Sequence, residues 1–204
     1  MSVMDSVING TEASVSDLLS FSEFFDLSID LLIKKDLKVL ADVSAKNIQM
    51  LVLDIDGVMT DGGMYYTEKG DEFKKFDTRD GVAIRRLSRR DFKVGIISSG
   101  YNVKLIQNRA DLLGIKYVHT GPDAKLDTLT RWSKELGIDM KNIAFIGDDR
   151  NDREAMEAVG VSACPADADN SVKEIATIIL SKKGGGGCIR EFVDLYLTDN
   201  PLTT

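Results

Sequence analysis

Short apolar runs alternate with helical patterns over most of the chain, and this alternation restricts the fold more than any other feature of the sequence. Strands that alternate with helices form a parallel sheet whose two faces are both covered. We therefore predict a doubly wound, Rossmann-like α/β domain over residues 46–204. The apolar runs lie at residues 51–53, 94–97, 116–118, 143–146, 161–163 and 177–180.

The segments between these runs carry apolar residues at the spacing of a helix. Glycine follows three of the segments, at the place where it commonly caps the end of a helix. We therefore predict helices over residues 82–90, 103–113, 124–136 and 153–159, with caps at Gly114, Gly137 and Gly160.

Two further segments interrupt the alternation. Residues 63–76 are typical of a β-hairpin with its turn at residues 68–70. The four glycines at residues 184–187 predict a flexible loop before a last amphipathic helix at residues 189–197. Because the intervals between the other elements are short, we expect a capless domain from which the hairpin protrudes.

The formal net charge of −7 is concentrated at the start of the chain. Residues 1–33 contain six acidic residues and no lysine or arginine, which leaves about −1 for the remainder. A near-neutral remainder does not favour a nucleic-acid partner, and no apolar run approaches the ~20 residues that span a membrane. The acidic start is unlike a secretory or mitochondrial signal, so we expect a cytoplasmic protein. Residues 1–45 are expected to form a partly helical extension of unassigned role, with helices near residues 15–25 and 29–40.

Polar side chains follow four of the predicted strands. In an open α/β sheet the ligand binds outside the carboxyl ends of the strands, so these side chains should meet in one crevice. In chain order they are Asp54 and Asp56, Ser99, Lys125, and the acidic group of Asp148, Asp149 and Asp152.

Clustered carboxylates repel one another unless a cation or a proton offsets their charge. One or two carboxylates together with a substrate phosphate suit Mg²⁺. A hydroxyl and a lysine beside the ion would stabilise charge on a phosphoryl group. Of the two carboxylates in Asp54-x-Asp56, one could attack phosphorus to give an aspartyl-phosphate, while the other protonates the leaving alcohol and then activates water.

Four stretches, "DIDGVMTDG", "IISSG", "GPDAK" and "GDDRND", match in order the motifs of the haloacid dehalogenase superfamily of phosphatases, and the chain resembles that family over residues 46–198. The resemblance implies that Asp54 is the nucleophile and a magnesium ligand. It also implies that Asp56 is the acid/base and offers its backbone carbonyl to the metal. The remaining implied roles are a further metal ligand at Asp148, phosphoryl contacts from Ser99 and Lys125, and metal-side support from Asp149 and Asp152.

Within the family the chain is most similar to the branch that hydrolyses octulosonate 8-phosphate or nononate 9-phosphate, two 2-keto-3-deoxy sugar acids. The stretches "FDTRDGVAIR", "GPDAKL" and "GGGGCIREFVDLYL" carry this likeness. The branch implies a homotetramer in which each hairpin helps to close a neighbouring site. The octulosonate enzymes of this branch carry an arginine at the position where this chain has Tyr101. The positions implied to contact the substrate are Asp77, Thr78, Arg79, Asp80, Gly81, Arg85, Gly100 and Arg109.

Two other classes of protein are compatible with parts of this pattern. A catalytically silent oligomerisation module, related to those appended to nucleotide-sugar synthetases, would share the fold, but retention of Asp54, Asp56 and Lys125 argues against it. A phosphoacceptor receiver domain also combines acidic residues, a hydroxyl and a lysine. Its acidic pair comes early in the chain, whereas Asp148 and Asp149 come late here. We therefore expect a phosphatase that acts on a phosphorylated sugar acid.

Overall fold

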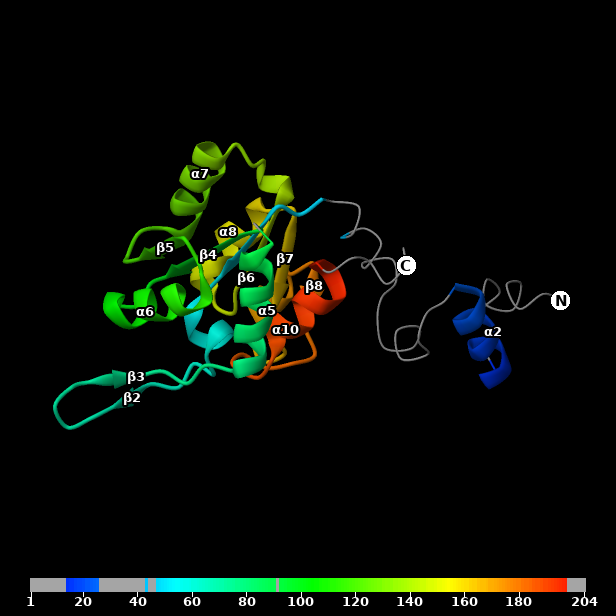
Figure 1. Ribbon diagram of the computed structural model, residues 1–204, viewed down its shortest axis with the longest axis horizontal. Helices are drawn as coiled ribbons and strands as arrows, with labels where there is room; N and C mark the ends of the chain where they lie inside the picture. Colours follow the sequence, from blue (N-terminus) through cyan, green and yellow to red (C-terminus); the bar gives the residue numbers. More distant parts are fainter. Residues whose placement is uncertain (1–13, 26–42, 44–46, 91, 198–204) are drawn as a thin grey trace.

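The computed structural model describes residues 14–25, 43, 47–90 and 92–197. Its centre is a six-stranded sheet in the order β5-β4-β1-β6-β7-β8, in which every neighbouring pair is parallel (Figure 1). The chain runs outward from β1 through β4 to β5, returns to the other side of β1 at β6, and continues to β8. The order therefore reverses beside β1, which confirms the doubly wound sheet. The strands are β1 (Met50–Leu53), β4 (Lys93–Ser98), β5 (Tyr117–Thr120), β6 (Ile143–Ile146), β7 (Val161–Cys164) and β8 (Ile178–Ile179).

Helices cover both faces of the sheet and enclose two apolar clusters. The first cluster lies under α5 (Thr78–Arg89), α6 (Val103–Leu113) and α10 (Cys188–Phe192). The second lies under α7 (Lys125–Leu136) and α8 (Arg153–Ala158). The remaining helical segments are α2 (Val15–Phe25), η1 (Ile55–Met59), η2 (Met140–Asn142), η3 (Arg150–Asp152), α9 (Asn170–Lys173) and η4 (Val193–Leu197).

Strand β1 is apolar throughout because it is buried on both faces. Leu51 and Leu53 belong to the first cluster, whereas Met50 and Val52 belong to the second. Successive side chains of a strand point to opposite faces, so each cluster receives two of the four. The strand is thereby held between β4 and β6, and the residues that follow it emerge at the carboxyl edge of the sheet.

Two of the three predicted glycine caps are confirmed. Gly114 and Gly137 end α6 and α7 with φ values of 74° and 64°, in the left-handed region that glycine adopts without steric cost. The prediction for Gly160 is wrong, because α8 is capped by Val159 in an extended conformation. Gly160 instead lies against η2, where a Cβ atom would be 1.8 Å from the carbonyl oxygen of Lys141.

The predicted hairpin is present as β2 (Tyr65–Tyr66) and β3 (Glu72–Phe73), which pair antiparallel and project from the body of the domain (Figure 1). Gly70 forms its turn with φ of 87°. The hairpin and α5 account for the chain between η1 and Arg90, so the described residues contain no cap domain there.

The N-terminal extension is described only in part. The helix predicted at residues 15–25 is confirmed as α2, while the helix predicted at residues 29–40 lies outside the described residues. None of the described helices is both long enough and apolar enough to cross a bilayer.

The glycine run at residues 184–187 is not the flexible loop that the sequence predicts. Gly184 and Gly185 are buried against η1, and the backbone N–H of Gly185 donates to the carbonyl oxygen of Val58 at 3.0 Å. A Cβ atom on Gly184 would lie 1.8 Å from the carbonyl oxygen of Gly57. The glycines therefore allow the segment before α10 to pack backbone to backbone against the loop that follows β1.

This contact predicts that a single methyl group at position 184 will destabilise the domain. We expect Gly184→Ala to lower the free energy of unfolding by about 1–3 kcal/mol, the usual cost of forcing extra atoms into a packed site. Gly186→Ala is the matched control, since its Cβ would meet nothing closer than 3.1 Å and its φ is not positive. Urea unfolding of both variants measures the difference, and equal losses would contradict the role given to Gly184.

Candidate active site

The loop after β1 brings two carboxylates to the carboxyl edge of the sheet. Asp54 directly follows β1, and its backbone N–H donates to the carbonyl oxygen of Ile146 on β6 at 3.0 Å. Its side chain is only 8% exposed. In the turn that follows, Gly57 has φ of 87°, and a Cβ atom there would lie 1.9 Å from Oδ2 of Asp148. Glycine at position 57 thus lets the Asp148 carboxylate approach the β1 loop.

Lys125, the first residue of α7, is the cation at the base of the site. Its ammonium is buried and lies 2.8 Å from Oδ1 of Asp54 and 2.6 Å from Oδ1 of Asp152. Burial alone would lower the pKa of Lys125, but the charges of Asp54 and Asp152 outweigh burial and raise it. Lys125 therefore stays charged and fixes one oxygen of Asp54.

Asp152 supports the site from below. It is completely buried, and while Oδ1 accepts from Lys125, Oδ2 accepts from the backbone N–H groups of Asp148 and Asp149 at 3.0 and 3.2 Å. Both of its oxygens are thus occupied by protein donors. Support of a metal by Asp152 stays a prediction.

Carboxylate oxygens of Asp54, Asp148 and Asp152 lie within 4.8 Å of one another. Burial, and then the charge of Asp152, raises the pKa of Asp54 to about 7, although Lys125 opposes the rise. Burial, followed by the charges of Asp54 and Asp152, raises the pKa of Asp148 to about 8. Oδ1 of Asp148 is buried and has no hydrogen-bond donor among the described residues. The cluster therefore lacks positive charge on the side that faces Asp148.

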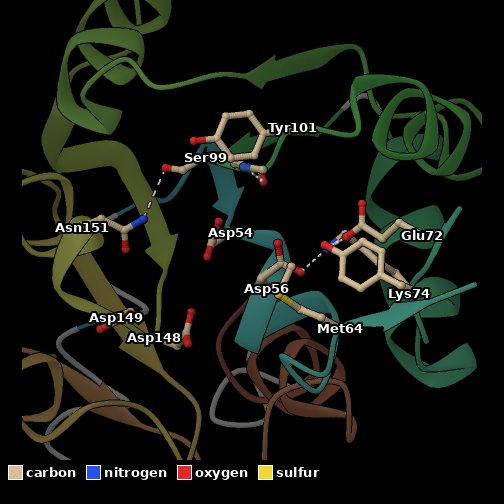
Figure 2. Close-up of a pocket in the computed structure, with 13 residues that line it drawn as sticks. Asp54, Asp56, Met64, Glu72, Lys74, Ser99, Tyr101, Asp148, Asp149 and Asn151 are labelled. Carbon is tan, nitrogen blue, oxygen red and sulfur yellow. Dashed lines mark hydrogen bonds and ion pairs between the residues drawn. The ribbon is translucent and has the colours of Figure 1, made fainter. Parts of the chain in front are cut away.

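These features fit a hard divalent cation such as Mg²⁺, which prefers carboxylate oxygens. Asp54 and Asp148 would hold it, because both carboxylates point into the same space (Figure 2). Asp149 points away from that space in the same view, and its carboxylate caps η3 by accepting from the backbone N–H of Arg150 at 2.8 Å. The carboxylate of Asp56 is turned toward Lys74 instead of the cluster.

A pocket of about 310 Å³ opens above this cluster. Its wall combines the loops after β1, β4 and β6 with one side of the hairpin. The lining residues are Asp54, Asp56, Met64, Tyr66, Glu72, Lys74, Ser98, Ser99, Gly100, Tyr101, Asp148, Asp149 and Asn151.

Two serines at the end of β4 share the pocket wall. The predicted Ser99 is exposed, and its Oγ accepts from the side-chain amide of Asn151 at 3.3 Å. Ser98 is buried, and its Oγ accepts from the backbone N–H of Gly100 at 3.1 Å. The motif quoted from the sequence contains Ser98, but the phosphoryl contact was assigned to Ser99 alone, and Asn151 was missed.

Of the eight residues that the family resemblance implies to contact the substrate, only Gly100 lines this pocket. Asp80 is buried and accepts from the backbone N–H groups of Gly187 and Arg190 at 3.3 and 2.7 Å. Its pKa is raised to about 6, first by burial. Within one chain Asp80 therefore joins α5 to the start of α10.

The neighbouring positions reinforce this junction. Asp77 caps α5, which explains why the helix begins at Thr78 and not at residue 82 as predicted. The guanidinium of Arg79 donates to the carbonyl oxygen of Gly186 at 2.9 Å.

Arg109 stacks over the ring of Phe76 at 4.7 Å. Gly81 lies against the guanidinium of Arg109, and Arg85 is exposed on α5. Contact between these positions and a substrate stays a prediction.

Comparison with known proteins gives consistent matches. Residues 118–191 match the family model of haloacid dehalogenase-like hydrolases. Over 161 residues the chain is 40% identical to the 3-deoxy-D-manno-octulosonate 8-phosphate phosphatase of Escherichia coli K12, covering 78% of this chain and 85% of that protein. The crystal structure of the phosphatase of that name from Yersinia pestis is similar at a TM-score of 0.74 and 38% identity, covering 78% and 84% of the two chains. The crystal structure of the phosphatase from Moraxella catarrhalis, in complex with magnesium, phosphate and KDO, is also similar. Its TM-score is 0.75 and its sequence identity is 29%, and the match covers 80% of this chain and 92% of that chain.

The acidic cluster predicts a pH-dependent gain in stability when one charge is removed. We expect Asp148→Asn to raise the melting temperature of the metal-free protein. The rise should be roughly 2–4 °C if removal of the repulsion between the carboxylates stabilises the protein by about 1 kcal/mol. A carboxyl whose pKa is raised on folding destabilises the folded state increasingly as pH rises from its ordinary value to its raised one. The gain should therefore grow between pH 5 and pH 8, as thermal unfolding can show.

We expect Mg²⁺ to raise the melting temperature of the wild-type protein and the Asp148→Asn variant to lose this rise, because a ligand stabilises only a protein that binds it. Asp149→Asn is the control, and its response to Mg²⁺ should stay close to that of the wild type. Full stabilisation of the Asp148→Asn variant by Mg²⁺ would contradict the assignment of Asp148 as a ligand.

Proposed function

This chain belongs to the haloacid dehalogenase-like hydrolases, and we propose that it is a magnesium-dependent phosphatase that acts on a phosphorylated 2-keto-3-deoxy sugar acid. It is a phosphoric monoester hydrolase by its relationship to the octulosonate 8-phosphate phosphatases, 85% of whose length it covers in the Escherichia coli protein. The candidates for the substrate are octulosonate 8-phosphate and nononate 9-phosphate. The fold without a cap domain and the acidic cluster agree with this family.

One observation carries the proposal, namely the buried pair of Asp54 and Lys125 beneath an open pocket. Lys125 holds Oδ1 of Asp54 at 2.8 Å and leaves its other oxygen available. A carboxylate that is fixed, partly desolvated and accessible from one side is suited to nucleophilic attack. A silent oligomerisation module would have no need for a buried lysine at this place, so the pair also argues against that alternative.

The proposed reaction has two steps on Asp54. The free carboxylate oxygen of Asp54 forms a bond to phosphorus while the bond to the ester oxygen breaks, and Asp56 gives its proton to that leaving oxygen. In the second step water attacks the phosphorus of the aspartyl-phosphate, and Asp56 takes the proton of the water. Phosphate leaves, and Asp54 is regenerated with both of its oxygens.

Lys125 and the pocket serines stabilise the phosphoryl oxygens in both steps. A magnesium ion, when bound by Asp54 and Asp148, would offset the charge of these carboxylates and of the phosphoryl group. Ser98 and Ser99 both line the pocket and can donate a hydroxyl to the phosphoryl group. These assignments extend the roles expected from the sequence.

We also propose that residues 46–204 form the phosphatase domain and that it assembles as a homotetramer. The hairpin exposes Met64, Tyr65, Tyr66 and Phe73, each close to half exposed or more. A two-stranded hairpin is marginally stable in water, and exposed apolar side chains of this kind usually meet another surface. A neighbouring copy that covers the hairpin would also help to keep water from the pocket.

The first test is phosphate release from octulosonate 8-phosphate, nononate 9-phosphate and several ordinary sugar phosphates, with and without Mg²⁺. We expect turnover of a sugar acid phosphate that requires the metal. Asp54→Asn, which keeps the size of the side chain but removes the nucleophile, should reduce turnover to background. Folded protein that releases phosphate from none of these compounds would overturn the proposal and favour the oligomerisation module.

Tyr101 is expected to influence the choice between the two sugar acids. It is 93% exposed at the rim of the pocket, where the octulosonate enzymes are expected to carry an arginine. Because arginine binds carboxylates with paired hydrogen bonds, Tyr101→Arg should raise kcat/KM for octulosonate 8-phosphate relative to nononate 9-phosphate. An unchanged ratio would show that position 101 does not set this preference.

A further inference from the structure

Lys74 is the only basic residue among the thirteen described residues that line the pocket. Its ammonium lies 2.5 Å from Oδ1 of Asp56 and 2.9 Å from Oε1 of Glu72, and its side chain is only 3% exposed (Figure 2). A buried ammonium is costly without partners, so this placement requires both carboxylates. Neither Lys74 nor Glu72 belongs to the motifs that identify the family.

Alternation along the hairpin explains how Lys74 reaches the site. Tyr66 pairs with Glu72 across the hairpin, and both line the pocket together with Lys74. The other pair, Tyr65 and Phe73, lies on the opposite face and is exposed. Because side chains alternate along an extended strand, Glu72 and Lys74 share the face that looks into the pocket of their own chain.

The two oxygens of Asp56 have different surroundings. Oδ1 accepts from Lys74, while the hydroxyl of Thr60 lies 3.4 Å from it and closer, at 3.2 Å, to the carbonyl oxygen of Ile55. Oδ2 has no donor within hydrogen-bond distance among the described residues and lies toward the Ser99–Tyr101 loop (Figure 2). A Cβ atom at Gly100 would be 3.7 Å from Oδ2 of Asp56. With Oδ1 occupied by Lys74, Oδ2 is the oxygen that remains to exchange a proton with a leaving group or with water.

Glu72 gives the ammonium of Lys74 a second carboxylate partner. Two ion pairs, at 2.5 Å to Asp56 and 2.9 Å to Glu72, fix the position of the ammonium. Lys74 therefore presents an N–H donor to Oδ1 of Asp56 from a defined direction.

We propose that Lys74, paired with Glu72, is a positioning residue for the reaction, which holds Oδ1 of Asp56 so that Oδ2 faces the leaving-group oxygen. This inference rests on the proposed phosphatase function. It assigns a catalytic purpose to the base of the hairpin in the chain's own site, separate from any contact that the hairpin makes with a neighbouring copy.

The test compares two substrates that differ in their need for an acid. A sugar acid phosphate releases an alkoxide that must be protonated, whereas p-nitrophenyl phosphate releases a phenolate that leaves without a proton. We expect Lys74→Met to reduce kcat/KM for the sugar substrate about 10- to 100-fold, part of the ~10²–10⁴-fold that general acid catalysis contributes. For p-nitrophenyl phosphate the reduction should stay below about 3-fold, because this substrate does not depend on general acid catalysis.

Two further variants separate positioning from structural damage. Lys75→Met is the matched control, since Lys75 is 68% exposed and pairs with Asp61 outside the pocket, and it should change neither rate. In the Asp56→Asn background, Lys74→Met should cause no additional loss on the sugar substrate, because residues that act as a unit are not additive.

Equal losses on the two substrates, an additive loss in the Asp56→Asn background, or no loss at all would overturn the role of Lys74. Wild-type protein that releases phosphate from neither compound would instead overturn the proposed function itself. An active wild type therefore separates failure of the inference from failure of the function on which it rests.

Discussion

The buried ammonium of Lys125 is the interaction on which the rest of the site depends. It is shared between Asp54 at the end of β1 and Asp152 at the end of η3, at 2.8 and 2.6 Å. Removing Lys125 would leave two buried carboxylates uncompensated, at a cost of several kcal/mol. The first turn of α7, the end of β1 and the loop after β6 are therefore fixed relative to one another. In the proposed mechanism, that geometry would set where phosphorus is attacked.

The remaining acidic residues are held together against their own repulsion. Gly57 lets Asp148 approach the β1 loop, and Gly184 lets the chain before α10 pack against the same loop from behind. Backbone packing thus keeps the carboxylates close, and burial together with this proximity raises the pKa values of Asp54 and Asp148. Electrostatic strain of this kind is typical of a site that is prepared for a charged ligand.

The sequence predicts the elements and the centre of the site because both depend on local patterns. Six apolar runs mark the six parallel strands, and the polar residues after four of them mark one edge of the sheet. It does not predict the packing of the glycine run or the position of Lys74, since both depend on contacts between distant segments. The positions from Asp77 to Gly81 illustrate the same limit, because the contacts of Asp80 with residues near 190 have no counterpart in periodicity.

The hairpin links the surface of the domain to its chemistry through the geometry of an extended strand. Phe73 lies between Glu72 and Lys74, so its exposed ring and their pocket-facing side chains are carried by the same short backbone. Any contact that covers Tyr65 and Phe73 also restrains the backbone that presents Lys74 to Asp56. A protruding hairpin without such a contact would hold Lys74 only through its two ion pairs. In the proposed assembly, strand alternation would therefore couple the contact with a neighbouring copy to the orientation of Asp56.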